Sequence, residues 1–241
     1  MDFPKSLARL VPFIRLARDH QTNGYEEIAR ETEVTVFVDG VPRATLLCLP
    51  AALQELALGH LMAGGVLDHP ARIAAIEVNP DGLGINVRTK PDVLPPYSPP
   101  PAPGLLRLAA GQVRALAGAL PTVSSLFQRT GGVHTGGLAD REGRLLFIYE
   151  DTGRHNVMDK IYGHCLLEGI TTGDKAMLFS GRCTAKIVMK LVTMGLPMVI
   201  ARGAPTTLAI HLAGENGITL VAFARPDRVS VYTHPERVTA W

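Results

Sequence analysis

Residues 130–160 hold the densest group of side chains that could do chemistry, in the order TGGVHTGGLADREGRLLFIYEDTGRHNVMDK. Two glycine pairs, the first ending at Gly132, bracket His134, and Gly153 precedes Arg154 and His155. Glycine pairs let the backbone turn with positive φ and let a ligand approach closely. Arginine and histidine at a helix start supply donors that suit a phosphate or a polar ring edge. We interpret the stretch as a ligand site; the alternative is two strands that turn at residues 140–143, with their polar side chains merely in solvent.

Arginine recurs after the predicted strands of the second half of the chain. Arg154 follows the strand that ends at residue 149, and three later turns carry Arg182, Arg202 and the pair Arg225 and Arg228. In sheets whose strands alternate with helices, ligands bind beyond the carboxyl ends of the strands. A single loop arginine is normally solvated, but arginines at equivalent places beside helix N-termini form an anion pocket. The pattern predicts a site for phosphate or pyrophosphate.

Several catalytic motifs are absent from the sequence. There is no GxxxxGK[ST] phosphate loop, no GxGxxG fingerprint and no GxSxG nucleophile turn. The zinc deaminases need His-Xaa-Glu and Pro-Cys-Xaa-Xaa-Cys, whereas His134 is followed by Thr135 and Gly136. We therefore predict no metal site.

The three cysteines, Cys48, Cys165 and Cys183, form no Cys-Xaa-Xaa-Cys motif and no even disulfide framework. This usage indicates a reducing compartment, and we expect a cytoplasmic location. Cys183 follows Arg182 near a predicted helix start, a position that lowers the pKa of a thiol. A buried, unreactive Cys183 is the equally weighted alternative.

The 241 residues are 46% hydrophobic and 19% charged, with a net charge of +2, as in an ordinary soluble protein. This balance argues against a polybasic surface that binds nucleic acid, and the apolar runs are too short to span a membrane. Residues 1–20 lack the apolar core and cleavage site of a secretory signal, and we expect a loose arm or a short helix there.

The first third of the chain predicts a small α+β domain. Two strands, 33–38 and 41–49, flank Asp39-Gly40, a strong hairpin signal. A helix follows from Pro50 to Gly64, and then strands 73–78 and 85–89. Residues 91–103 hold seven prolines and predict an extended linker, so we place the domains at 1–103 and 104–241.

The second domain alternates strands and helices, which indicates a three-layer α/β/α arrangement. The predicted helices are 105–120, 122–129, 156–167, 184–193 and 206–213, and the predicted strands are 144–149, 176–180, 198–201, 218–223 and 229–232.

Six ordered segments resemble the FdhD family, the accessory proteins of formate dehydrogenase. They are LPAALQELALGHLMAGGV, LFQRTGGVHTGGL, EDTGRHNVMDKIYG, SGRCTAKIVMK, RGAPTTLAIHLA and ITLVAFARPDRVSVYTHPERV. The resemblance runs from about residue 33 to 238. It implies a small N-terminal domain joined to a cytidine-deaminase-like α/β domain without the deaminase zinc motif.

The resemblance also implies a function. Family members receive sulfur from a cysteine desulfurase and pass it to the molybdenum bis(molybdopterin guanine dinucleotide) cofactor before its insertion into formate dehydrogenase. It implies a homodimer, and GDP serves as a surrogate for part of the cofactor. The cofactor-binding segment falls on Phe223, Ala224, Arg225, Pro226, Asp227 and Arg228. To these the glycine and arginine patterns add Gly132, His134, Arg154, His155, Arg182 and Arg202.

One departure from the family leaves three hypotheses open. The family carries its sulfur on a Cys-Xaa-Xaa-Cys loop between the domains, where this chain has the cysteine-free residues 91–103. Either Cys183 took over as the sulfur carrier, or the chain binds the cofactor without sulfur chemistry. The third hypothesis is an enzyme acting on a free nucleotide or phosphate ester, with His134, His155 and Asp151 as acid–base groups.

Overall fold

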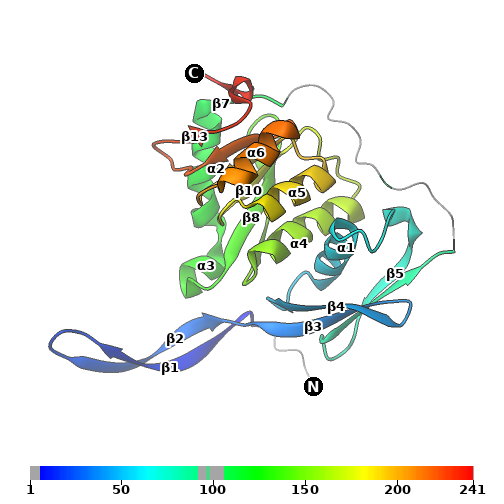
Figure 1. The fold of residues 1–241 in the computed structure, drawn as a ribbon. Helices are drawn as coiled ribbons and strands as arrows, with labels where there is room; N and C mark the ends of the chain where they lie inside the picture. The colour runs from blue at the N-terminus through cyan, green and yellow to red at the C-terminus, as the bar shows by residue number, and fades with distance from the viewer. Residues whose placement is uncertain (1–5, 92–96, 98–105, 241) are drawn as a thin grey trace.

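The computed structural model describes residues 6–91, 97 and 106–240. Its largest unit is built on a six-stranded sheet with the strand order β13-β12-β11-β10-β8-β9 (Figure 1). The strands are β8 (His134–Ala139), β9 (Leu145–Asp151), β10 (Ala176–Phe179), β11 (Met198–Ala201), β12 (Thr219–Ala222) and β13 (Ser230–Val231). The helices of this unit are α2 (Ala110–Val123), α3 (Ser125–Thr130), α4 (Arg154–Leu167), α5 (Ala185–Met194) and α6 (Thr207–Glu215).

Helices cover both faces of this sheet, because its central strands are apolar on both sides. In β10, Ala176 and Leu178 lie in a buried cluster with α2, whereas Met177 and Phe179 lie in the cluster that contains α4 and α5. Figure 1 shows α2 on one side of the sheet and α4, α5 and α6 on the other. The predicted three-layer α/β/α arrangement is confirmed.

From residue 144 onward the predicted elements match the structure to within two residues at each end. Helix α2 starts later than predicted, at Ala110, because Leu108 and Ala109 form a short strand, β7, paired with β14 (Val238–Thr239). The glycine-rich stretch is strand β8, paired with β9 as a hairpin, so the alternative of two strands is right for the backbone. Of the two glycine pairs, only Gly131 has positive φ.

The N-terminal unit pairs a four-stranded sheet with one helix, as predicted. Its strands are β3 (Thr32–Val38), β4 (Val41–Cys48), β5 (Ile73–Val78) and β6 (Gly84–Thr89), in the order β4-β3-β6-β5, and its helix is α1 (Leu53–Ala63). Asp39 and Gly40 both have positive φ, which fits the two-residue hairpin turn that joins β3 to β4. A short 3-10 turn, Pro70–Arg72, precedes β5, and another, Pro235–Arg237, precedes β14.

The expectation of a loose arm or a short helix at the N-terminus is wrong for the described residues. Strands β1 (Ala8–Leu16) and β2 (Gln21–Ala29) form an antiparallel hairpin that extends away from the rest of the molecule (Figure 1). Each strand supplies the hydrogen bonds of the other, and neither has another partner strand among the described residues.

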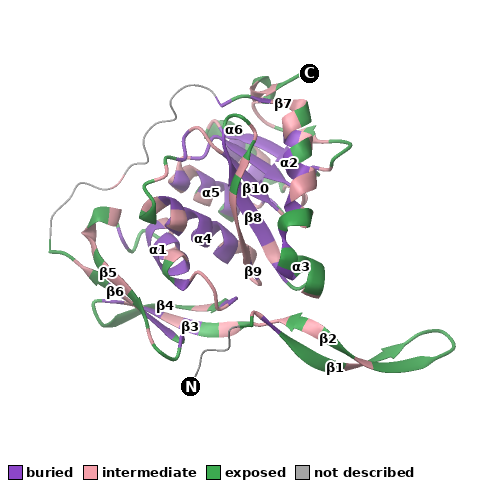
Figure 2. Ribbon diagram, turned by 180° about the vertical axis from the view of Figure 1, so that it is seen from behind, coloured by how far each residue is buried: buried purple, intermediate pink, exposed green. Residues whose placement is uncertain are grey.

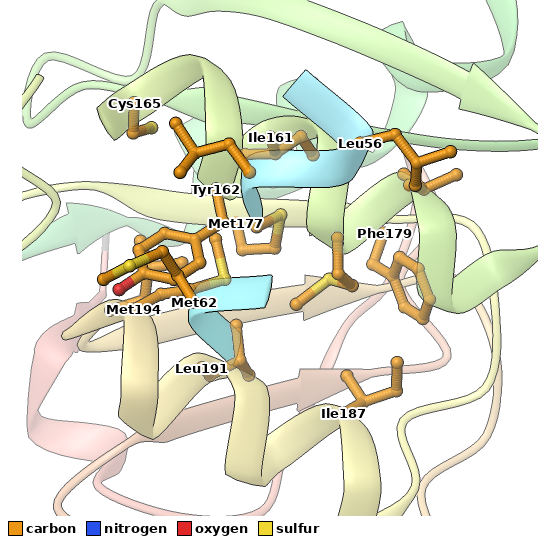
Figure 3. Packing of buried hydrophobic residues seen from close by; sticks show 14 of the residues in the cluster. Leu56, Met62, Ile161, Tyr162, Cys165, Met177, Phe179, Ile187, Leu191 and Met194 are labelled. Carbon is orange, nitrogen blue, oxygen red and sulfur yellow. The ribbon is translucent and has the colours of Figure 1, made fainter. Parts of the chain in front are cut away.

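The two larger units share one hydrophobic core. Helix α1 of the N-terminal unit packs against α4, and their side chains join those of α5 and the sheet in a single buried cluster (Figure 3). The helices cross at Gly59 and Gly163, where a Cβ atom on Gly163 would lie 2.6 Å from the carbonyl carbon of Glu55. Close contact of the two backbones therefore depends on glycine at the crossing.

Most of the proline-rich segment, residues 91–103, and the predicted domain boundary lie outside the described residues. In the part of the chain that the structure describes, no helix combines the length and apolar character needed to cross a bilayer.

Candidate functional site

The sheet topology brings most of the predicted site to one edge. Strands β10, β11 and β12 are mutually parallel, and β8 is antiparallel to both β9 and β10. Strand β9 therefore runs parallel to β10. The carboxyl ends of β9, β10, β11 and β12 thus lie at one edge of the sheet, together with the start of β8. This is the edge at which α/β sheets bind ligands.

A cavity of about 400 Å³ opens at this edge. It combines apolar walls with a few polar groups, as small-molecule sites do. Its lining consists of Leu120, Pro121, Phe127, Gly131, Gly132, Val133, His134, Thr135, Thr152, Ser180 and Arg202. Three of the predicted residues, Gly132, His134 and Arg202, thus lie together in the cavity wall.

His134 is half-buried at the first position of β8. Its Nδ1 lies 3.4 Å from Oγ of Ser180, a hydroxyl that accepts a hydrogen bond of 2.9 Å from the Thr135 N–H. Burial, and then the nearby positive charge of Arg154, lower the pKa of His134 from its ordinary value. The imidazole is therefore neutral near pH 7, so that one ring nitrogen donates a hydrogen bond and the other accepts one.

Arg202 and Arg225 are held together through the backbone. The Arg202 guanidinium donates to the carbonyl oxygen of Ala117 at 2.9 Å, and Arg225 donates to the carbonyl oxygen of Arg202 at 2.8 Å. Burial, and then the charge of Arg225, lower the pKa of Arg202, which nevertheless keeps its proton at neutral pH. Two neighbouring cations therefore stand beside the cavity, a suitable arrangement for a phosphate group.

The segment 223–228, which the resemblance assigns to the cofactor, lies beside the cavity and not in its lining. It forms the turn from β12 to β13, closed by a hydrogen bond of 2.8 Å from the Arg225 N–H to the Arg228 carbonyl. Ala224 is buried, whereas Phe223, Pro226, Asp227 and Arg228 are exposed, and Arg228 pairs with Asp227 at 3.0 Å. The turn contacts the cavity residue Arg202 through the side chain of Arg225.

Arg154 and His155 are the first two residues of α4, Arg182 lies in the turn between β10 and α5, and none of the three lines the cavity. Arg154 is half-buried, and its Nε is buried without a hydrogen-bond partner among the described residues. Burial, followed by the charges of Lys190 and Arg154, lowers the pKa of His155. Arg182 is exposed. The predicted residues thus separate into a cavity-lining set and a basic set beside it.

The sequence patterns missed a buried polar group below the cavity. The hydroxyl of Ser124 bonds to the carboxylate of Glu150 and lies 2.6 Å from the hydroxyl of the cavity residue Thr135. Ser124 and Thr135 are buried. Nothing in the sequence near Ser124 marked it, because its partners come from β8 and β9.

Asp151 does not have the surroundings of an acid–base catalyst. It is fully buried, and Nζ of the equally buried Lys160 lies 2.6 Å from its Oδ2. It also accepts hydrogen bonds from the backbone N–H groups of Leu49 and Gly153 and from the side chain of Asn156, at 3.2, 2.8 and 2.9 Å. Asp151 therefore holds the Gly153 turn, and none of its side chain is exposed to a ligand.

Of the two interpretations of Cys183 that the sequence left open, the structure favours the buried thiol. All three cysteines are buried, and burial raises the pKa of Cys48, Cys165 and Cys183 to about 12. Helix α5 begins only at Ala185, with Thr184 as its N-cap, and the Cys183 N–H is bonded to the carbonyl of Ala204 at 3.0 Å. The thiol therefore packs in the core, in line with the alternative of a buried, unreactive cysteine.

Comparison with known proteins places the chain in a family. The chain matches the FdhD/NarQ family over residues 29–97 and 92–239. It is 34% identical over 242 residues to the sulfur carrier protein FdhD of Bacillus pumilus (strain SAFR-032), covering 89% of this chain and 91% of the relative. The corresponding protein of Bacillus subtilis (strain 168) is 33% identical over 241 residues, with coverage of 88% and 90%.

A solved structure extends the agreement to the fold. The crystal structure of a protein from Desulfotalea psychrophila, assigned as a formate dehydrogenase accessory protein, superposes with a TM-score of 0.86 and 29% sequence identity. The superposition covers 97% of this chain and 100% of that one. The chain belongs to the FdhD/NarQ family.

Proposed function

We propose that this protein is a formate dehydrogenase accessory protein that binds the molybdenum bis(molybdopterin guanine dinucleotide) cofactor as cargo and carries no sulfur on a cysteine of its own. The observation that supports cargo binding is the cavity at the carboxyl edge of the sheet, with His134, Ser180 and Arg202 in its wall. The burial of all three thiols supports the second half of the proposal.

The cavity suits one nucleotide arm of the cofactor. A volume of about 400 Å³ lies in the range of small-molecule sites and accommodates a group the size of a nucleoside diphosphate. The guanidinium of Arg202 would face the pyrophosphate, and the apolar walls from α2 and α3 would cover the base and ribose. Arg225 would hold Arg202 in place through its carbonyl oxygen.

GDP is the test ligand for this assignment. Because charge-assisted contacts to phosphate are lost, Arg202→Ala should weaken GDP binding by about tenfold or more in isothermal titration calorimetry. Arg225→Ala should weaken it less, since that side chain acts through Arg202. Arg88→Ala is the matched control, because Arg88 is an exposed arginine of β6 in the N-terminal unit. Equal affinities for the wild-type protein and Arg202→Ala would remove the cavity assignment.

The state of the cysteines is tested separately. Since a thiolate is the attacking species, the folded protein incubated with a cysteine desulfurase and cysteine should gain no sulfur adduct in intact mass spectrometry. The Bacillus subtilis relative, named a sulfur carrier protein, is the positive control. An adduct on the wild-type protein that disappears in Cys183→Ser would instead establish Cys183 as a sulfur carrier, whatever the outcome with GDP.

A further inference from the structure

The elements beside the cavity have a one-sided balance of charge. Residues 181–214 run from the turn after β10 through α5 and β11 into α6, and they contain no aspartate or glutamate, although the whole chain has 22 acidic residues among 241. Their cations are Arg182, Lys186, Lys190 and Arg202. Residues 152–158, at the start of α4, also lack an acidic residue and contribute Arg154. Positive charge therefore gathers here, although the net charge of the chain is only +2.

Helices α4 and α5 bring these cations to one face. The two helices lie side by side on the same side of the sheet (Figure 1), and Nζ of Lys190 lies 3.5 Å from the carbonyl oxygen of His155. Burial lowers the pKa of His155, and so do the charges of Lys190, Arg154 and Lys186, which places all three cations near it. A Cβ atom on Gly181, next to Arg182, would lie 3.5 Å from the Cβ of Arg154. We call this surface the basic face: Arg154, Arg182, Lys186 and Lys190.

Most of the charge on the basic face is unpaired. Of its four cations only Lys190 forms a salt bridge with a described residue, and that residue is Asp159, a buried carboxylate that also lies 3.1 Å from Nδ1 of His60. Arg182 and Lys186 are exposed to solvent. The face thus presents positive charge that no described residue neutralises.

Several other exposed cations of the molecule are neutralised. On the β1–β2 hairpin, which Figure 2 shows as almost entirely exposed, Arg15 pairs with Glu26, and Glu27 pairs with Arg129 of α3. Four more arginines have carboxylate partners: Arg72, Arg88, Arg141 and Arg144. Such pairs leave little charge for another molecule, whereas unpaired charge attracts a partner of opposite sign. The basic face is therefore suited to an anionic partner.

The spacing of the cations fits an extended partner. Lys186 and Lys190 lie about 6 Å apart along the axis of α5, and Arg182 precedes Lys186 by the same number of residues. The row therefore spans on the order of 10 Å, the length of about three residues of an extended chain and longer than a single phosphate group. Met189 follows Lys186 by three residues, so it lies on the same side of α5, and it is 47% exposed.

Charge and apolar character together select the partner. A small phosphate compound would use the cations but not Met189, and a net charge of +2 is low for a protein that binds nucleic acid. A polypeptide with an apolar side chain among its carboxylates matches both features. We propose that the basic face is a docking surface for an acidic segment of a partner protein. The proposal does not depend on the ligand of the cavity.

Fluorescence anisotropy of the full chain with a fluorescein-labelled peptide that repeats Glu-Glu-Leu tests the proposal. The peptide should bind at low ionic strength and dissociate as salt is added, because exposed charges are screened. Arg182→Gln combined with Lys186→Gln should weaken binding by about tenfold or more. The matched control is Arg43→Gln combined with Lys90→Gln, which removes two exposed cations of the N-terminal unit and should change the affinity less than about twofold.

Competing ligands distinguish the other occupants. GDP should not displace the peptide, because the cavity is lined by other residues, and displacement by GDP would overturn the proposal. Tripolyphosphate, or a single-stranded DNA oligonucleotide, that binds as tightly as the peptide and is weakened by the same double variant would overturn it as well. So would equal weakening by the two double variants, tight binding of a peptide that repeats Gln-Gln-Leu, or no binding of the acidic peptide to the wild-type protein. Circular dichroism on each variant confirms that the fold is kept.

Discussion

Replacing Lys160 by methionine should lower the free energy of unfolding by about 3–5 kcal/mol. The ammonium group of Lys160 is fully buried, and besides Asp151 it donates to the carbonyl oxygens of Leu49 and Glu150 at 3.2 and 3.1 Å. Methionine fills a similar volume, so packing is largely kept, but the Asp151 carboxylate remains buried without its cation. Urea denaturation of the two proteins measures the difference.

The exposed ion pair between Arg88 and Glu77 is the control, and Arg88→Ala should cost less than about 1 kcal/mol. Removing both buried charges, in Asp151→Leu with Lys160→Met, should not restore stability. The carboxylate also satisfies three N–H donors, from Leu49, Gly153 and Asn156, which leucine would leave unpaired. A loss below 1 kcal/mol in Lys160→Met would show that the pair is not needed for stability.

Gly163→Ala should lower the free energy of unfolding by about 3 kcal/mol or more, a loss comparable to that of Lys160→Met. One added methyl group would overlap the Glu55 backbone of α1, and a backbone cannot rotate out of the way as a side chain can. The two helices must separate, which opens the core that joins the N-terminal unit to the sheet (Figure 3). The urea midpoint and the yield of folded protein report the effect.

Gly111→Ala is the matched control for this substitution. Gly111 lies in α2 with open space where a Cβ would sit, so alanine there should raise stability by about 0.5–1 kcal/mol through its better helix propensity. Similar effects of the two substitutions would contradict the tight helix crossing.

Local patterns predicted most of the fold. The Asp39-Gly40 turn, the helix that ends at Gly64 and the strand–helix alternation after residue 144 all follow from signals a few residues long, and the structure confirms them. The N-terminal hairpin was missed because the apolar residues of β1 beyond Ala8 are largely exposed and have no core to pack against among the described residues. Their spacing therefore lacked the context that distinguishes a strand from a short helix.

The candidate site was predicted in part. The arginine-bearing turns were found because parallel strands bring their ends together regardless of what lies between them. Whether Arg202 lines the cavity while Arg182 faces solvent depends on side-chain packing that no local pattern contains. The same holds for Cys183 and Lys160, whose burial comes from partners far away in the sequence: Lys160 meets Leu49, 111 positions earlier.

The hydrophobic core that the N-terminal unit shares with the six-stranded sheet also has a consequence for synthesis of the protein on the ribosome. The apolar side of α1 is complete once residue 63 has been made, but the helix that covers it, α4, begins only at Arg154. At translation speeds of about 5–20 residues per second, α1 waits roughly 5–20 s before its partner emerges. During that interval the N-terminal unit exposes Leu56, Leu61 and their neighbours, so the nascent chain is a natural client for chaperones that hold apolar segments.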